Sequence, residues 1–276
     1  MLVLIYKDML SGKSVIRQLS EFATARGKEI GYENVFDYSL GNPSVPVPQE
    51  FTDTMINMLQ EESAAVLHGY SPSLGIWSVR ERIAASLQKR FGIPYQAEHI
   101  FMAVGAAGAL AHAFRLVTEP GDEILTFAPF FPEYHPYVDL TGAQLKVVPA
   151  DTEQFQINFA AFESMLSQKT MAVLINTPNN PSGIVYSAET IKRLAQVLRD
   201  KSEEYGHDIY LISDEPYREI VFEGVDAPCV SAYYDNTIMC YSFSKSLSLP
   251  GERIGYVAVN PACKDAADMV QMCGQI

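Results

Sequence analysis

The sequence lacks the residue patterns of metal, disulfide-rich and nucleic-acid-binding proteins. Its four cysteines, Cys229, Cys240, Cys263 and Cys273, show no Cys-x-x-Cys spacing, and its five histidines are not paired. Neither a metal site nor a disulfide framework is therefore expected, and the thiols are expected to be reduced and mostly buried. A net charge of −13 leaves no basic surplus for phosphates, which argues against nucleic acid or an anionic membrane as a partner.

Long apolar runs are also missing. The run at the start, Met1 to Tyr6, is too short to span a bilayer, and no signal-peptide pattern follows it. No internal repeat or low-complexity tract is visible. With 48% hydrophobic residues, 276 residues can still bury a sizeable core. We therefore expect a soluble cytoplasmic protein of one large domain or two small ones.

From residue 100 onward, short apolar or β-branched runs alternate with helical stretches. The expected strands are 100–104, 123–127, 144–148, 171–176, 209–213, 237–241 and 254–259, and the expected helices are 106–117 and 191–198. Such alternation predicts an α/β three-layer sandwich with a mostly parallel sheet covered on both faces. In such sheets, ligands bind beyond the carboxyl ends of the strands.

The first part of the chain shows helical spacing instead. Apolar residues recur with a helical period over 14–25, 51–59 and 76–87. A turn rich in glycine and proline, from Gly41 to Pro48, separates the first of these helices from the rest. It is a plausible boundary between an N-terminal segment and the main body.

One stretch, Tyr241 to Tyr256, combines a lysine, an arginine and several hydroxyl groups. The expected strand 237–241 leads into a turn that contains Ser242 and Lys245, and Arg253 follows. A partly deprotonated lysine amine can form a Schiff base with a carbonyl compound, while arginine and small hydroxyls bind phosphate. Pyridoxal phosphate needs both. The alternative is a solvated loop lysine beside an ordinary surface arginine, because short motifs often occur by chance.

The longer pattern resembles a known family. Ser242, Lys245, Arg253 and Gly255 stand in the order and spacing of the lysine signature of class I/II aminotransferases. With the segments described below, seven matching motifs follow in the family order and cover nearly the whole chain. The resemblance implies the type I pyridoxal-phosphate fold: a large domain with a seven-stranded, mostly parallel sheet and a smaller domain built from both chain ends.

A glycine-rich turn follows the expected strand 100–104. It lacks the Gly-x-Gly-x-x-Gly spacing, which disfavours a nicotinamide or flavin site. Backbone N–H groups at such a strand-to-helix turn favour an anion, although a purely structural turn fits equally well. By resemblance, Gly105, Ala106 and Ala107 match the turn that holds the cofactor phosphate.

Four further residues match family positions around the cofactor ring. On local chemistry alone Phe131 could belong to the core, Asn180 to a turn, and Asp214 to a helix cap or a solvated charge. By resemblance, Phe131 stacks on the ring and Asn180 bonds the ring oxygen and contacts the substrate. Asp214 keeps the ring nitrogen protonated, and Tyr217 lies beside the ring oxygen.

Two weaker matches concern the partner subunit and the substrate. Tyr70 matches the tyrosine that reaches into the partner's phosphate site, so the resemblance implies a homodimer. Gly41 matches the glycine whose backbone meets the substrate carboxylate. The resemblance implies domain boundaries at 1–40 for an N-terminal segment of the small domain and 41–260 for the cofactor-binding large domain.

The last residues, 261–276, read as the start of a helix that leads into the rest of the small domain. Family chains continue beyond this point and include an arginine that binds the substrate α-carboxylate, for which no residue here is a candidate. We therefore expect a C-terminally truncated chain with an incomplete small domain and impaired turnover. A chain extended to full length is expected to transaminate, and this one at most weakly.

The function implied by the resemblance is amino-group transfer between an amino acid and a 2-oxo acid, dependent on pyridoxal phosphate and without a metal. Lys245 would carry the cofactor and move a proton, with Asp214 and Tyr217 as the other catalytic residues. Two alternatives stay open. The same scaffold supports carbon–sulfur β-lyase chemistry, and the chain could also be a non-catalytic remnant that binds the cofactor.

Overall fold

The computed structural model describes residues 15–276, and the chain divides into two compact units, residues 1–44 and 45–276. In the first unit, helix α2 (Val15–Ile30) is followed by the short 3-10 helix η1 (Tyr32–Asn34). The ring of Tyr32 folds back onto Gly27, where an added Cβ would lie 2.3 Å from a ring carbon. The predicted helix 14–25 thus exists and is longer, and its first residue, Ser14, lies outside the described residues.

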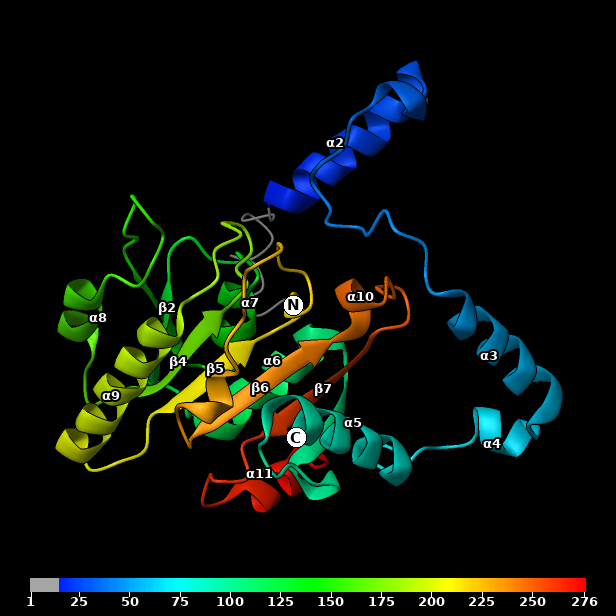
Figure 1. Cartoon of the computed structure of the whole chain (residues 1–276). Helices are drawn as coiled ribbons and strands as arrows, with labels where there is room; N and C mark the ends of the chain where they lie inside the picture. The colour runs from blue at the N-terminus through cyan, green and yellow to red at the C-terminus, as the bar shows by residue number, and fades with distance from the viewer. Residues whose placement is uncertain (1–14) are drawn as a thin grey trace, which may run out of the picture. The chain divides into compact units, whose positions relative to one another are not determined.

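The second unit is built around a seven-stranded sheet, as predicted (Figure 1). Its strand order is β1-β7-β6-β5-β4-β2-β3. Strand β7 runs antiparallel to both of its neighbours, and the other six strands are parallel to one another. The strands are β1 (Ile100–Val104), β2 (Glu123–Phe127), β3 (Gln144–Val148), β4 (Thr170–Asn176), β5 (Tyr210–Asp214), β6 (Thr237–Ser242) and β7 (Ile254–Val259).

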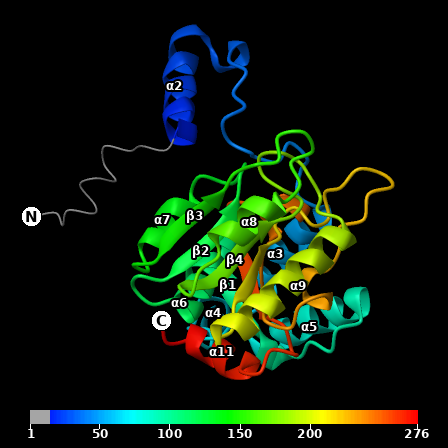
Figure 2. The ribbon, with the colours of Figure 1, turned by 90° about the vertical axis from the view of Figure 1, so that its left-hand side faces the viewer.

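Helices cover both faces of the sheet, which gives the predicted three layers. Helices α6 (Gly105–Val117), α7 (Tyr134–Asp139) and α11 (Ala266–Cys273) bury their apolar sides on one face. The other face is covered by α8 (Phe159–Met165) and α9 (Ala188–Tyr205), seen together in Figure 2, and by α5 (Trp77–Phe91). Strand β6 contributes side chains to the cores on both faces of the sheet, because its residues alternate between the two faces.

Two helices that precede α5 stay outside these cores. Helices α3 (Gln49–Glu61) and α4 (Ala64–His68) contain no buried residue. Large apolar side chains on them are exposed, namely Met55, Ile56, Met58, Leu59 and Val66. Short pieces complete the unit: the 3-10 helices η2 (Ala97–His99) and η3 (Val230–Ala232), and α10 (Phe243–Ser246). Within residues 15–276, no helix is long and apolar enough to cross a membrane.

The strand boundaries agree with the sequence expectations to within one residue, because each strand is an apolar run with polar or turn residues at its ends. Helix boundaries agree less well. Helix α9 continues seven residues beyond its predicted end at 198, because its exposed last turns carry no apolar period. The short helices α7 and α8 were not predicted. Helix α11 lies in the segment 261–276, which was expected to begin a helix.

Candidate active site

The predicted site residues of the second unit, apart from Tyr70, gather at one edge of the sheet. Strands β1, β2, β4, β5 and β6 are parallel, so their carboxyl ends meet at this edge. Strand β7 runs the other way and therefore begins there. The residues at or just beyond these strand ends are Gly105 after β1, Phe131 after β2, Asn180 after β4, Asp214 in β5, Ser242 in β6 and Arg253 before β7.

Gly255 lets the backbone of three elements come together at this edge. Gly255 pairs with Ser242 of β6 and with Ala103 of β1. A Cβ at Gly255 would lie 2.4 Å from the carbonyl oxygen of Tyr241 and 2.9 Å from the Cα of Gly105. No side chain fits in that space. The glycine brings the end of β6, the start of β7 and the start of α6 into direct contact.

Arg253 lies against the first residue of α6. Gly105 has φ +70°, and an added Cβ would lie only 2.7 Å from Nη2 of Arg253. Arg253 itself has φ 53°, in the left-handed region, and its Nη1 donates to the carbonyl oxygen of Pro250 at 2.9 Å. The N-cap of α6, Val104, has no side-chain acceptor, so the first N–H groups of the helix and the guanidinium together suit an anion.

Two buried serines lie at the end of β6. The backbone N–H of Ser244 donates to Oγ of Ser242 at 3.0 Å, and Oγ of Ser242 donates to Oγ of Ser244 at 2.6 Å. Ser242 is thereby the N-cap of α10, the short helix that carries Lys245. Ser244 was not among the predicted site residues.

Asp214 is a buried carboxylate, and only one of its two side-chain oxygens has a hydrogen-bond partner among the described residues. Its Oδ2 accepts a hydrogen bond from the hydroxyl of Tyr134 at 2.6 Å, and its backbone oxygen accepts from Nδ2 of Asn176 at 2.8 Å. Oδ1 is buried without a hydrogen-bond partner among residues 15–276. Burial raises the pKa of Asp214 to about 7, against the opposing effect of the Tyr134 hydrogen bond, and Glu215 adds to the rise. A positive N–H donor at Oδ1 would satisfy this oxygen and keep the carboxylate charged.

Asn180 and Tyr217 face each other beside Asp214. The backbone N–H of Asn180 donates to Oδ1 of Asn176 at 2.6 Å, which ties the loop after β4 to the end of that strand. Burial raises the pKa of Tyr217 and the nearby Asp214 raises it further, whereas a hydrogen bond with the Asn180 side chain lowers it. A side-chain amide and a phenol thus lie within hydrogen-bond reach of each other.

Phe131, the aromatic residue after β2, lies one side chain away from Asp214. The ring of Phe131 meets the ring of Tyr134 edge to face, with centroids 5.6 Å apart, and is only partly buried. Through Tyr134 it is one contact away from Asp214. A partly exposed aromatic ring one contact away from a buried carboxylate suits a flat, positively charged ring.

Lys245 is the third residue of α10 and is half-buried. Burial lowers the pKa of its ammonium group, because a charged amine loses hydration in the protein. A larger fraction of neutral amine is therefore present near neutral pH than for an exposed lysine. The neutral amine is the form that attacks a carbonyl carbon.

The other two predicted residues, Tyr70 and Gly41, do not belong to the strands and turns described above. Tyr70 is fully exposed, at 109% of its reference area. Gly41 belongs to the first unit. Their predicted roles stay predictions.

Sequence reasoning missed three residues that the fold places at the site: Tyr134, Asn176 and Ser244. Asn176 had a detectable signal, since it is a polar residue at the end of an apolar strand. Ser244 lies inside the lysine motif. Tyr134 gave no local signal, because its partner Asp214 is 80 residues away in the chain.

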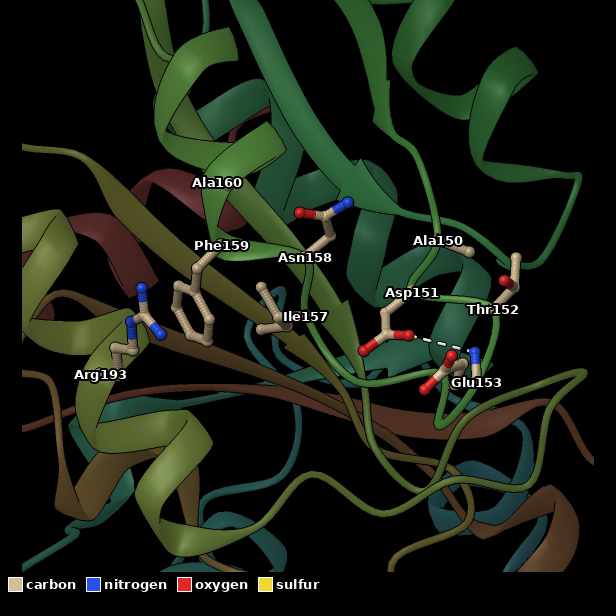
Figure 3. Close-up of a pocket in the computed structure, with 9 residues that line it drawn as sticks. All are labelled: Ala150, Asp151, Thr152, Glu153, Ile157, Asn158, Phe159, Ala160 and Arg193. Atoms are coloured by element: carbon tan, nitrogen blue, oxygen red, sulfur yellow. Dashed lines mark hydrogen bonds between the residues drawn. The ribbon is translucent and has the colours of Figure 1, made fainter.

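A surface cavity of about 580 Å³ lies elsewhere, in the loop between β3 and α8 (Figure 3). Phe159 and Arg193 border it, with the guanidinium carbon of Arg193 4.0 Å from the ring centre. Asp151 accepts a hydrogen bond from the backbone of Glu153 at 3.1 Å. None of the predicted site residues lines this cavity, so it is separate from the edge described above.

Comparison with known proteins identifies the family. The profile named Aminotransferase class I and II matches residues 33–274. The chain belongs to the class I and II aminotransferase family. The family assignment from the lysine motif is thus confirmed, and so is the type I fold. Enzymes of this family use pyridoxal phosphate.

Individual aminotransferases resemble the chain over most of its length. A crystal structure of an amino transferase from Eubacterium rectale has a TM-score of 0.93 and 46% identity, over 100% of this chain and 70% of that one. The aspartate aminotransferase of Thermotoga maritima is 30% identical over 93% of this chain and 69% of the relative. A crystal structure of an aspartate aminotransferase from Thermotoga maritima has a TM-score of 0.83 and 29% identity, over 95% of this chain and 67% of that one.

A probable N-acetyl-LL-diaminopimelate aminotransferase of Bacillus subtilis is 28% identical, over 82% of this chain and 55% of the relative. The chain thus spans between 55% and 69% of the length of these two curated relatives.

Proposed function

We propose that the chain acts as a pyridoxal-phosphate-dependent aminotransferase that moves an amino group between an amino acid and a 2-oxo acid. The buried, unpartnered Oδ1 of Asp214 among the described residues is the observation that carries the proposal. Such an atom is costly unless a ligand satisfies it, and a protonated pyridine nitrogen supplies a charged N–H donor. Once bound, the cofactor acts as the electron sink for the substrate's α-carbon.

The residues at the sheet edge fit the remaining parts of the cofactor. Arg253, Ser242 and the backbone of Gly105, Ala106 and Ala107 would hold its phosphate, and thereby keep its ring from turning.

The other residues would hold the ring and carry out the proton transfer. Phe131 would cover the ring face, and Asn180 and Tyr217 would bind the ring oxygen. Nζ of Lys245 would bind the aldehyde carbon and then move a proton at the substrate's α-carbon. Asn180 and the backbone of Gly41 are the proposed substrate contacts.

The named relatives favour transamination over the two alternatives. The proteins compared above are called aminotransferases, two of them by the substrate names aspartate and N-acetyl-LL-diaminopimelate. Aspartate is therefore the first amino donor to test, with a panel of 2-oxo acids. Carbon–sulfur β-lyase activity would instead release pyruvate and ammonia without a 2-oxo acid acceptor.

The proposal is tested by covalent labelling at Lys245. Purified chain is mixed with pyridoxal phosphate, reduced with borohydride and digested, and the peptide that contains Lys245 is examined by mass spectrometry. We expect a pyridoxyl group on Lys245 and none in Lys245→Ala. Absence of the label on the unmodified chain would overturn cofactor binding. A label without amino transfer to any 2-oxo acid would favour the non-catalytic remnant.

We further propose that the chain forms a homodimer in which Tyr70 reaches the partner's phosphate site. The full exposure of Tyr70 and the exposed apolar side chains of α3 support it. Sedimentation velocity that shows only monomer over a wide concentration range would contradict it. The proposed domain division, with residues 41–260 as the cofactor-binding domain, and the proposed cytoplasmic location can be tested by limited proteolysis and by cell fractionation.

A further inference from the structure

A buried tyrosine, Tyr241, connects α10, which carries Lys245, with the turn that follows Tyr217. Tyr241, the residue before Ser242, is only 4% exposed. Its hydroxyl donates to Oε2 of Glu219 at 2.9 Å and is 2.8 Å from Oγ of Ser246. Glu219 pairs in turn with Arg90 of α5, Oε1 to Nη2, at 2.8 Å. A chain of polar contacts therefore runs from α5 to the last residue of α10.

The direction of these bonds follows from donor counting. A phenol has one proton to donate, and the Glu219 carboxylate can only accept, so the Tyr241 proton lies toward Glu219. The Ser246 hydroxyl must then be the donor to the tyrosine oxygen. Burial raises the pKa of Tyr241, so its proton stays in place throughout the physiological range.

The two hydrogen-bond partners of Tyr241, Ser246 and Glu219, are close in sequence to proposed catalytic residues. Ser246 directly follows Lys245, and α10 is only four residues long, so a bond at its last residue limits the position of the lysine. Glu219 lies two residues after Tyr217, and the turn between them is closed by the N–H of Ile220 on the Tyr217 carbonyl at 2.8 Å. Tyr241 thus fixes the position of α10 relative to the turn at residues 217–220.

Ring packing makes Tyr241 a rigid anchor. Its ring stacks on that of Tyr256 of β7, with centroids 5.0 Å apart, and meets Phe243 edge to face at 5.2 Å. Phe243 belongs to α10, so it is the stack on Tyr256 that holds the ring of Tyr241 to the sheet independently of the helix. We propose that Tyr241, together with Glu219 and Ser246, is a positioning group that fixes Lys245 for reaction with a carbonyl carbon. This inference rests on the proposed function, because it concerns the same lysine.

The test measures the rate at which pyridoxal phosphate labels Lys245, by borohydride quenching at set times and mass spectrometry of the Lys245 peptide. Tyr241→Phe removes only the hydroxyl and leaves the ring packing. We expect labelling to slow about fivefold, because the hydrogen bond that holds Ser246 to the tyrosine is lost. Ser246→Ala should slow it similarly, and Tyr241→Phe with Ser246→Ala should add little, because both remove the same contact.

Tyr234→Phe is the matched control. Tyr234 is 3% exposed, and its hydroxyl donates to the carbonyl oxygen of Ile209 at 2.6 Å, away from Lys245. It should lower thermal stability as Tyr241→Phe does and leave the labelling rate unchanged. Glu219→Gln, which keeps an acceptor for the tyrosine, should retain most of the rate.

The results separate the inference from the proposed function. Equal labelling rates for the unmodified chain, Tyr241→Phe and Ser246→Ala would overturn the positioning role. The role would also fail if Tyr234→Phe slowed labelling as much as Tyr241→Phe. No labelling of the unmodified chain would instead overturn the proposed function. If Tyr241→Phe fails to fold, the Ser246→Ala rate decides.

Discussion

Two neighbouring carboxylates at the end of β5, Asp214 and Glu215, are both buried but differ in their hydrogen bonds. Glu215 is 0% exposed, and its oxygens accept from Oγ of Ser213 at 2.7 Å and from the guanidinium of Arg218. Arg218 also donates to the carbonyl oxygen of Ala227 at 3.1 Å. Asp214, one residue earlier, keeps Oδ1 without a partner among the described residues.

The difference separates a structural charge from one reserved for a ligand. The Glu215–Arg218 pair is internally neutral and hydrogen-bonded, so its partners within the chain suffice. Burial raises the pKa of Asp214 to about 7. In the folded chain without a ligand, the charged form of this carboxylate is therefore destabilised. A buried group that the fold leaves unsatisfied is a sign of function, and the following experiments test this contrast.

Asp214→Asn should have the largest effect on function. The amide has no charge to hold the pyridine proton, so we expect kcat/KM to fall by about three orders of magnitude or more, within the range for lost proton control. Steady-state transamination at saturating cofactor measures it. Asp139→Asn, an exposed change on α7, should have no effect. Comparable activity of Asp214→Asn and the unmodified chain would remove the proposed role.

Arg218→Met should have the largest effect on stability. It leaves the Glu215 charge buried without its partner, which we expect to lower the free energy of unfolding by about 3–5 kcal/mol. Urea denaturation followed by circular dichroism measures the loss. Adding Glu215→Gln should recover a good part of it, because the orphaned charge is then gone. A loss below about 1 kcal/mol would mean that this pair is not the structural charge described above.

The pH dependence of stability should reveal Asp214. Its folded pKa lies above the unfolded value, so between about pH 4 and pH 7 the folded chain keeps a proton that the unfolded chain has released. Stability of the cofactor-free chain should therefore decrease as pH rises through this window, by at most about 4 kcal/mol from this group. Urea midpoints at pH 4.5 and 8 measure the decrease. Asp214→Asn should remove this decrease. If the unmodified chain and Asp214→Asn showed the same dependence of stability on pH, the raised pKa of Asp214 would be contradicted.

Tyr134→Phe should have the smallest effect. It removes the donor to Oδ2 of Asp214, which we expect to cost about 1–3 kcal/mol of stability. Because this hydrogen bond lowers the pKa of Asp214, its loss should move the upper end of the pH window upward. The same urea series detects the shift. Tyr186→Phe serves as the control, as another buried tyrosine. A shift to lower pH would contradict the geometry.

Much of the fold was readable from local pattern. Apolar runs bounded by turns gave the strands, whereas Asn180, Asp214 and Ser242 were assigned by resemblance to the family and each follows or ends such a run. Strand ends are short-range features, so sequence spacing locates them. The common edge follows once the strands are parallel, since parallel strands end on the same side.

What the sequence could not supply were the contacts between distant residues. Tyr134 and Tyr241 look like ordinary core aromatics, and only the tertiary fold brings their hydroxyls to Asp214 and Glu219. The unpartnered oxygen of Asp214 is likewise a property of the whole neighbourhood, because every surrounding element must fail to reach it. The roles predicted for Tyr70 and Gly41 stay predictions.

The reversed direction of β7 has a consequence for how this site tolerates change. Since β7 starts at the edge where β6 ends, Ser242, Lys245 and Arg253 come from a single uninterrupted hairpin. Only the connecting bend, residues 247–252, separates the lysine from the arginine. Insertions or deletions in that bend would leave both strand ends anchored in the sheet but would displace Pro250, whose carbonyl oxygen accepts the hydrogen bond from Arg253. The length of the bend is therefore constrained by the arginine and not by the strands.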